Sequence, residues 1–191
     1  MFNFLIDTAD EAYIKNKWKQ IKNVVPKENV VGITTNPNAF YKTGDFTIEQ
    51  WRKRAHKLCS LLREIRGDKE GTLHVQFPNS NLTEQMFKKW IKIVSTFTNG
   101  DAKIAVKVPP YKKSLEIACK HRGNISLNTT GIADAGTALF ALTHDIEYAS
   151  IIPGRMEEVK IDAKSHVGYV MNSIKGNKKL ITGSMRTLKG L

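Results

Sequence analysis

The sequence predicts an α/β fold, a (β/α) barrel of the TIM type that stops after its seventh strand. Short apolar segments alternate with helical patterns along all 191 residues, as βα units around a parallel sheet do. No Gly-x-Gly-x-x-Gly or Walker-type loop follows a strand, so a doubly wound nucleotide-binding sheet would lack its phosphate loop. Nearly every predicted strand ends in a polar residue of a type used in catalysis, and in a barrel these ends meet at one mouth.

The count of strands is the weak point of this prediction. Only residues 184–191 follow the seventh predicted strand, and they are too few to supply an eighth strand and helix. The barrel would have to close with a gap, be completed by a partner, or reuse another segment. We expect a single domain over residues 1–191, because no linker or low-complexity tract interrupts the chain.

The first half of the chain contains three predicted strands, at 2–7, 29–34 and 72–77. A helix begins near Asp10, and a long polar loop covers 36–45. Thr47 and Gln50 form a capping-box pattern that predicts the start of a second helix. The apolar faces expected for three helices are Ala12, Tyr13, Trp18 and Ile21; Trp51, Ala55, Leu58, Leu62 and Ile65; and Met86, Trp90, Ile91, Val94 and Phe97.

The second half repeats the alternation. Strands are predicted at 103–108, 124–129, 147–152 and 178–183, and helices at 112–119, 133–142 and 157–174. In the last helix the residues expected to face inward are Val159, Ala163, Val167, Val170 and Ile174.

Composition excludes several classes of protein. With 41% hydrophobic and 25% charged residues, the chain is typical of soluble globular proteins, and its apolar runs are too short to span a bilayer. The first residues lack a signal peptide's pattern. Cys59 and Cys119 fall in helical patterns, where we expect buried free thiols in a reducing cytoplasm.

The net charge of +12 raises the possibility of nucleic-acid binding. The lysines, however, are dispersed over several predicted helices, which favours a solvated surface that attracts phosphorylated metabolites at long range. Nucleic acid is therefore not the expected partner. The five histidines show no metal-ligand spacing, and we expect neither a metal nor a cofactor.

Lys107 stands near the end of the fourth predicted strand, just before Pro109 and Pro110. An ammonium buried without a partner is disfavoured, which lowers the pKa of a lysine and makes it a candidate Schiff-base nucleophile. The alternative is a strand-end lysine that extends to water. Other polar residues at or just after predicted strand ends are Asp7, Thr34, Asn36, Gln76, Asn128, Thr130, Ser150 and Ser184.

Six short blocks carry a family resemblance. They are Leu5-Ile-Asp-Thr-Ala-Asp10, Gly32-Ile-Thr-Thr-Asn-Pro37, Val106-Lys-Val-Pro109, Asn128-Thr-Thr130, Ser150-Ile-Ile-Pro-Gly-Arg155 and Gly183-Ser-Met-Arg186. In this order and near these spacings, the chain resembles the transaldolase and fructose-6-phosphate aldolase family of class I aldolases, in its small-subunit transaldolase-like type. The resemblance covers residues 2 to about 187, and the first two blocks together are its most specific part.

The resemblance implies a catalytic role for two strand ends. Lys107 would attack the ketose C2 carbonyl and form a protonated imine, an electron sink that lets the C3–C4 bond break. Asp7 would take the proton of the C4 hydroxyl; its alternative role, capping the first helix, suits Asp10 better. The sugar hydroxyls at C1 and C3 would be bound by Asn36, Asn128 and Ser150, with Thr34 lining the same wall, although buried Asn and Thr are often purely structural.

Two further positions bear on which activity the family resemblance implies. Gln76 and Thr130 correspond to the pair that positions a catalytic water; transaldolases carry Glu at the first position, whereas the aldolases carry Gln. The aldolases also have a Tyr acid/base where this chain has Ile152, which has no proton to give. Slow proton transfer to the enamine favours transfer to a second aldehyde over release of dihydroxyacetone.

Arg155, Ser184 and Arg186 resemble the family's phosphate-binding residues, and a guanidinium matches phosphate oxygens well. The alternative for Arg186 is a solvated residue of the tail. Family members continue into an eighth strand and a terminal helix that helps to build ring-shaped oligomers. We expect a homo-oligomer here too, but its form cannot be carried over from the family.

The sequence therefore predicts a cytoplasmic, transaldolase-like enzyme that transfers a dihydroxyacetone unit between sugar phosphates. Its expected partners are fructose 6-phosphate, erythrose 4-phosphate and glyceraldehyde 3-phosphate. One alternative is a fructose-6-phosphate aldolase that releases dihydroxyacetone, and another is a catalytically impaired relative that serves as a basic binding or scaffold protein.

Overall fold

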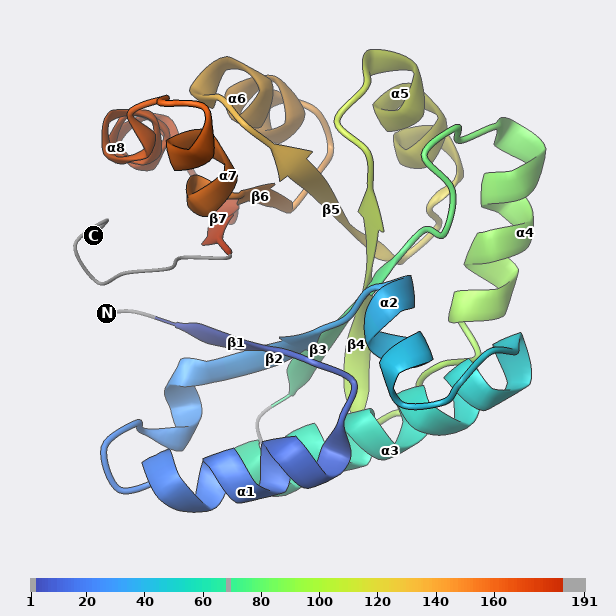
Figure 1. Cartoon of the computed structure of the whole chain (residues 1–191). Coiled ribbons are helices and arrows are strands. Elements are labelled where there is room, and N and C mark those ends of the chain that lie inside the picture. The colour runs from blue at the N-terminus through green and yellow to red at the C-terminus, as the bar shows by residue number, and fades with distance from the viewer. Residues whose placement is uncertain (1–2, 68–69, 184–191) are drawn as a thin grey trace. The chain divides into compact units, whose positions relative to one another are not determined.

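The computed structural model describes residues 3–67 and 70–183, and it confirms the predicted α/β class (Figure 1). The strands follow one another in chain order through one sheet, which is the strand order of a (β/α) barrel. The pairs β1–β2, β2–β3, β5–β6 and β6–β7 are parallel. The strands are β1 (Phe4–Asp7), β2 (Val30–Thr34), β3 (Gly71–Gln76), β4 (Ala102–Val108), β5 (Ser126–Ile132), β6 (Tyr148–Ile151) and β7 (Lys179–Thr182).

Helices occupy most connections between the strands. They are α1 (Glu11–Ile21), α2 (Pro37–Lys42), α3 (Ile48–Arg66), α4 (Glu84–Val94), α5 (Lys112–His121), α6 (Ala135–Thr143), α7 (Pro153–Glu158) and α8 (Ala163–Ser173), with a 3-10 turn, η1 (Lys27–Asn29), before β2.

Two compact units divide the chain. Unit 1 consists of Met1–Asn79 and Lys88–Val106, and unit 2 consists of Ser80–Phe87 and Lys107–Leu191. The sequence-based expectation of a single domain over residues 1–191 stays a prediction.

In unit 1, α1 and α3 lie along the same side of β1, β2 and β3 (Figure 1). The apolar face predicted for α3 is confirmed, because each of its five residues is buried. The predicted capping box is present as well: the Thr47 hydroxyl accepts from the Gln50 backbone N–H, and the Gln50 side chain accepts from the Thr47 N–H. Such a cap satisfies two of the unpaired N–H groups of a helix start.

Three predictions in unit 1 and α4 were wrong. The polar loop expected at 36–45 contains α2, a two-turn helix. In α1, Ile14 is the buried residue, and Tyr13 is 52% exposed. In α4, Phe87 is buried whereas Met86 is exposed, so the buried face begins one residue later than its apolar spacing suggested.

In unit 2, helices α6, α7 and α8 pack on β5, β6 and β7 around one apolar cluster. The helix predicted at 157–174 is two helices, because Lys160 takes a positive φ of 59° between them. Val159, expected to face inward, is 65% exposed at this break. The predicted inward positions Ala163 and Val170 are buried, and Val167 and Ile174 pack against the cluster.

The two cysteines differ in their burial. Cys59 is a buried free thiol, as predicted, and burial, with a smaller contribution from the nearby Asp101 carboxylate, raises its pKa to about 12. Cys119 is only partly buried, so the expectation of a buried thiol is wrong there.

Gly32 allows β2 to approach β3 closely. A Cβ on Gly32 would lie 2.2 Å from the Thr72 carbonyl oxygen and 2.8 Å from Leu5 Cδ2, and Thr72 is its partner in the β2–β3 register. Because the nearest obstacle is backbone, no side chain can move to make room for a methyl group.

We therefore expect Gly32→Ala to lower the free energy of unfolding by about 3 kcal/mol, as overpacking does. The control is Gly168→Ala in α8, where an added Cβ has nothing within 4 Å. That substitution should raise the free energy of unfolding by about 0.5–1 kcal/mol, because Ala favours a helix over Gly. Urea denaturation of the two variants measures both values; equal effects would contradict the role given to Gly32.

Candidate functional site

The ends of β1 and β2 lie side by side and carry the first two predicted site residues. Asp7 is the last residue of β1 and pairs in register with Thr34, the last residue of β2. Beyond Thr34, the backbone N–H and hydroxyl of Thr35 both donate to the carbonyl of His74, at 2.8 and 3.0 Å. These two bonds fix the course of the chain between Thr34 and α2, so Asn36 follows at a defined position.

Asn36 caps α2. Its Oδ1 accepts from the Ala39 backbone N–H at 2.9 Å, and Pro37 occupies the first turn, an arrangement that favours helix initiation. Because Oδ1 is engaged in the cap, the side-chain amide N–H groups of Asn36 are the ones it can offer to a ligand.

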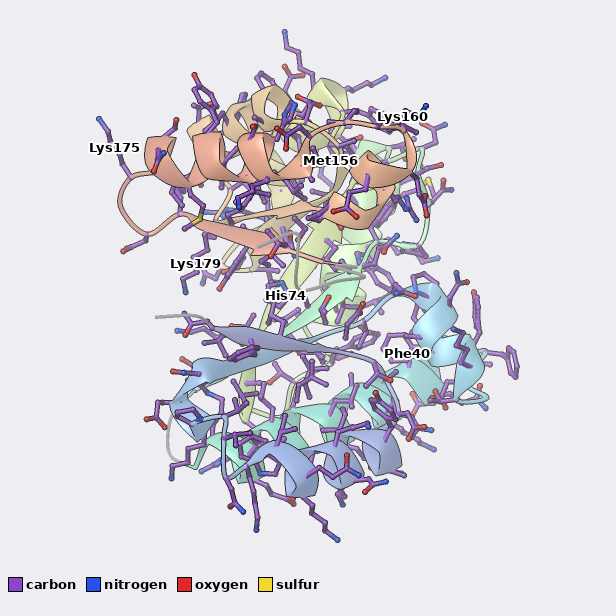
Figure 2. All side chains as sticks on the ribbon, turned by 60° about the vertical axis from the view of Figure 1, so that its left-hand side comes forward. Phe40, His74, Met156, Lys160, Lys175 and Lys179 are labelled. Atoms are coloured by element: carbon purple, nitrogen blue, oxygen red, sulfur yellow. The ribbon has the colours of Figure 1, made fainter. Side chains whose placement is uncertain are left out.

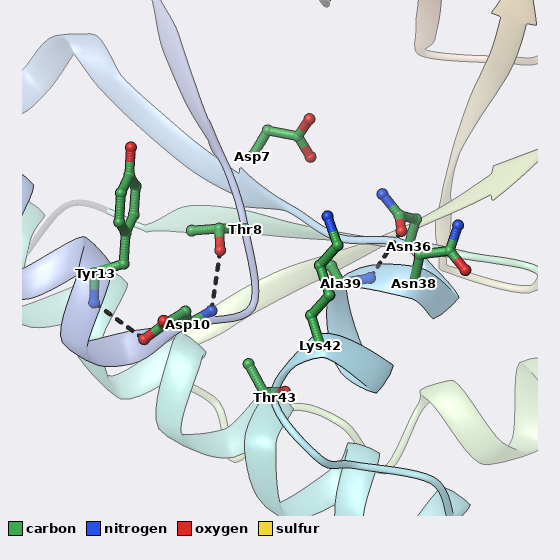
Figure 3. A pocket seen from close by; sticks show the side chains of 9 residues that line it. All are labelled: Asp7, Thr8, Asp10, Tyr13, Asn36, Asn38, Ala39, Lys42 and Thr43. Carbon is green, nitrogen blue, oxygen red and sulfur yellow. Dashed lines mark hydrogen bonds between the residues drawn. The ribbon is translucent and has the colours of Figure 1, made fainter.

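A cavity of about 490 Å³ opens over these strand ends within unit 1. Figure 3 shows the carboxylate of Asp7, the amide of Asn36 and the ammonium of Lys42 directed into it. Its other lining residues are Thr8, Asp10, Tyr13, Asn38, Ala39 and Thr43. The size and polar lining suit a small polyhydroxylated molecule.

Asp10 does the capping that the sequence assigned to it. Its Oδ1 accepts from the Tyr13 backbone N–H at 3.0 Å, and its own N–H donates to the Thr8 hydroxyl at 3.1 Å. Asp7 is therefore not needed as a cap for α1, which removes the structural alternative weighed for this carboxylate.

A partly buried ion-pair network supports the cavity wall. Arg54 on α3 donates to Asp45 at 2.8 Å and to Glu11 at 2.7 Å, and these contacts raise the pKa of Arg54, with the hydrogen bond to Asp45 as the largest cause. The Thr43 hydroxyl lies 2.7 Å from the Asp45 carboxylate, and Trp51 Nε1 donates to the Asp45 carbonyl at 2.8 Å. The network thus connects the starts of α1 and α3 with the end of α2.

In unit 2, Asn128 and Ser150 form a buried polar pair. The Ser150 hydroxyl donates to Asn128 Oδ1 at 2.8 Å, and the two residues are 1% and 8% exposed. Their neighbours Ala149 and Ile151 belong to the apolar cluster under the helices. Since successive strand residues alternate between faces, the Asn128–Ser150 pair occupies the face opposite the helices.

Thr130 lies two residues after Asn128 and shares its face, and a bulge at Gly131 follows directly after it. Thr130 is in register with Ser150, and Ile132 is in register with Ile151, so the register shifts by one residue between them. Gly131 has a φ of +83°, a conformation that glycine adopts without strain. The extra residue lets Thr130 face away from the helices while Ile132 joins the apolar cluster.

Lys107 is buried, with 9% of its surface exposed. It belongs to unit 2, as Asn128, Thr130 and Ser150 do, and the residues on either side of it, Val106 and Val108, are fully buried. This burial favours the predicted reactive lysine over a lysine that extends to water, and the role of Lys107 stays a prediction.

The remaining predicted site residues lie on other elements or outside the described residues. Gln76 ends β3 and is partly buried, and Arg155 is exposed on α7. Ser184 and Arg186 lie outside the described residues. Thus the structure brings Asp7 together with Thr34 and Asn36, and Asn128 together with Ser150 and Thr130.

Sequence reasoning missed Lys42 and Asn38. Both line the cavity, but both fall in the segment that was predicted to be a loop. The signal that could have identified them is the cap itself, because Asn followed by Pro at the start of a segment with buried Phe40 is a helix-start pattern.

The described residues contain no group of three or more His, Cys, Asp or Glu side chains placed to hold a metal ion. The histidines have structural contacts instead; His166 Nδ1, for example, accepts from the Ala135 backbone N–H at 2.9 Å. In the part of the chain that the structure describes, no helix is long and apolar enough to cross a membrane.

The positive charge is spread over separate segments, as expected. Lys160 lies between α7 and α8, Lys175 follows α8 and Lys179 begins β7; all three are exposed (Figure 2).

The sequential strands of a (β/α) fold bring polar strand ends to one edge, and a buried strand lysine is a candidate Schiff-base nucleophile. The fold alone does not determine the activity. The profile of the family described as "Transaldolase/Fructose-6-phosphate aldolase" matches residues 4–184. The chain belongs to this family, and family membership supports a transaldolase- or aldolase-type activity.

Curated relatives agree with this assignment. A probable transaldolase of Flavobacterium psychrophilum is 26% identical, over 98% of this chain and 89% of its own length. A probable transaldolase of Phocaeicola vulgatus is also 26% identical, over 88% of this chain and 69% of its own length. A solved thiamine phosphate pyrophosphorylase from Pyrococcus furiosus superimposes with a TM-score of 0.59 and 12% identity, covering 95% of this chain and 74% of that one. At that identity the likeness shows the fold alone.

The Asp45–Arg54–Glu11 network gives a prediction for stability. Arg54→Met leaves the buried Asp45 carboxylate without its guanidinium, which should lower the free energy of unfolding by about 2 kcal/mol. Arg52→Met on the same helix removes only an exposed pair with Glu49 and should leave the urea midpoint unchanged. If both variants unfold at the same urea concentration, the network does not support the cavity wall.

Proposed function

We propose that the chain is a class I transaldolase, which transfers a dihydroxyacetone unit between sugar phosphates through an imine on Lys107. The observation that carries the proposal is the burial of Lys107 in a strand whose neighbours Val106 and Val108 are fully buried. A lysine amine held inside a strand is a candidate nucleophile toward a carbonyl. Family membership supplies the reaction class.

The first part of the reaction needs Lys107 and Asp7. Lys107 Nζ adds to C2 of the ketose, and loss of water gives the protonated imine. Asp7 accepts the C4 hydroxyl proton, the C3–C4 bond breaks, and its electron pair moves into the imine to give an enamine. In the second half an acceptor aldehyde takes the place of the departed one, and Asp7 returns the proton.

Hydrogen-bonding side chains would hold the dihydroxyacetone unit. Because the Ser150 proton is donated to Asn128, Ser150 Oγ is suited to accept from a sugar hydroxyl. Asn36 offers its amide N–H groups, since its Oδ1 caps α2, and Thr34 lines the same wall. Each of these roles is a further part of the proposal.

The phosphate of the substrate would be held by Arg155, which is exposed on α7, together with Ser184 and Arg186. The expected substrates are fructose 6-phosphate as donor, erythrose 4-phosphate as acceptor and glyceraldehyde 3-phosphate as the product of the donor. A cytoplasmic location and a homo-oligomer complete the proposal, and imine chemistry calls for no cofactor.

Whether the enamine is protonated or attacks a second aldehyde depends on three residues, Gln76, Thr130 and Ile152. Gln76 and Thr130 would position a water molecule, but an amide cannot act as a base. Ile152 is the residue before α7 and has no proton to donate. Slow protonation prolongs the life of the enamine, which favours attack on a second aldehyde. A fructose-6-phosphate aldolase that releases dihydroxyacetone is the alternative within the family.

The first test is borohydride trapping with fructose 6-phosphate, followed by peptide mass spectrometry. We expect one reduced adduct, on Lys107, and its loss in Lys107→Met. The matched control is Lys103→Met, because Lys103 lies on the same strand but is exposed and paired with Glu70. No adduct on any lysine would refute the Schiff base and favour the binding or scaffold protein.

The second test separates transfer from release. With fructose 6-phosphate alone we expect little glyceraldehyde 3-phosphate, and a strong increase when erythrose 4-phosphate is added. Ile152→Tyr supplies a phenolic proton donor and should raise the release of free dihydroxyacetone relative to transfer. Equal product formation with and without the acceptor would instead establish the aldolase.

A further inference from the structure

Lys42 is a cation placed in the cavity that holds Asp7. It lies in the last turn of α2, and its ammonium is directed into the cavity on the side of Asp7 and Asn36 (Figure 3). Asn36 caps the first turn of the same helix. The position of Lys42 relative to β2 is therefore set by a short, capped helix and not by a flexible loop.

The side chains of Lys42 and Asp7 differ from most others in the cavity lining in their hydrogen bonds within the chain. Thr8, Asp10, Asn36 and Thr43 each take part in a hydrogen bond within the chain. Within residues 3–67 and 70–183, by contrast, the structure records no hydrogen bond or ion pair for the side chain of Asp7 or of Lys42. An acceptor and a donor of opposite charge thus point into one cavity without a partner from the described chain.

The charges of the cavity decide which group Lys42 can receive. An anionic substituent at Lys42 would also lie near two carboxylates, Asp7 and Asp10, and would be repelled by both. A neutral hydroxyl suits the site better, since it can donate to the carboxylate and accept from the ammonium. The hydroxyl that loses its proton to Asp7 develops negative charge, and a fixed donor stabilises such charge in the transition state.

We propose that Lys42 is a further catalytic residue, which donates a hydrogen bond to the C4 oxygen of the sugar. When Asp7 removes the C4 hydroxyl proton, the O–H electron pair forms the C4 carbonyl and the C3–C4 bond breaks. The pair of that bond forms the C2=C3 double bond of the enamine, and the π pair of the C2=N bond moves to the nitrogen. Lys42 keeps its proton throughout. In the transfer half-reaction it polarises the carbonyl of the acceptor aldehyde. This inference rests on the function proposed above.

The test compares Lys42→Met with Lys42→Arg and with Lys15→Met, which removes an exposed lysine outside the cavity. Three readings are taken for each: borohydride trapping with fructose 6-phosphate, kcat and KM with erythrose 4-phosphate as acceptor, and kcat and KM with erythrose, which lacks the phosphate. Lys42 is exposed at a helix end, so the fold should tolerate each change, and circular dichroism checks this.

We expect Lys42→Met to form the trapped adduct normally, because imine formation at C2 does not involve the C4 oxygen. Its kcat should fall about 100-fold with both acceptors, as when an oxyanion donor is removed, with KM little changed. Lys42→Arg should restore part of the loss, and Lys15→Met should behave like the unsubstituted chain.

Two results would overturn the role of Lys42 while leaving the proposed function intact. An unchanged kcat in Lys42→Met shows that the ammonium does not act on the reacting oxygen. A rise in KM with erythrose 4-phosphate but not with erythrose shows instead that Lys42 binds the phosphate. Absence of a trapped adduct in the unsubstituted chain refutes the proposed function, and the role of Lys42 falls with it.

Discussion

The burial of Lys107 is the constraint around which the proposed chemistry of the chain is arranged. A buried amine loses its hydration, and polar groups around it can offset that loss. β4 is buried on both of its faces at this point, as strands of parallel sheets are. The neighbouring strand in the sheet, β5, is the one that carries Asn128 and Thr130 on its helix-free face. A lysine would weaken an ordinary core strand. Lys107 is tolerated in β4 because the neighbouring strand, β5, carries polar side chains.

In a parallel α/β sheet, polar side chains can lie on one face of a strand while apolar side chains pack into the core on the other. Each strand alternates between a helix-covered face and an open face, so Ala149 and Ile151 can join the apolar cluster while Ser150 reaches Asn128. The Gly131 bulge extends this division, because it places Thr130 and Ile132 on opposite faces although they are two residues apart. In unit 1 the short helix α2 positions a polar side chain, because its cap residue Asn36 also lines the cavity.

Much of this could be predicted from the sequence. The alternation of strands and helices gave the fold class, the capping box located α3, and the strand ends gave the polar residues, since these features depend on local patterns. The errors arose where tertiary packing overrides local pattern. Six residues of α2 are too few for a hydrophobic period, the positive φ of Lys160 breaks a continuous helical pattern, and α1 buries Ile14 although Tyr13 and Trp18 make a larger apolar stripe. Lys42 was missed because its helix was missed.

The same reasoning explains why the two activities of the family are hard to separate on this chain. Under the proposed mechanism both begin with the imine and both need a base at the C4 oxygen, so the roles proposed for Lys107 and Asp7 do not distinguish them. The difference lies in what reaches the enamine first, a proton or an aldehyde. In the proposed mechanism, an amide at Gln76 and an alkyl side chain at Ile152 would slow proton transfer to the enamine. A donor that polarises the carbonyl of an incoming aldehyde speeds the competing step, and in unit 1 the residue with the right charge and direction for it is Lys42. Under the proposal, the two neutral side chains would slow protonation of the enamine and the cation would speed its attack on an aldehyde. Both effects would favour transfer over release.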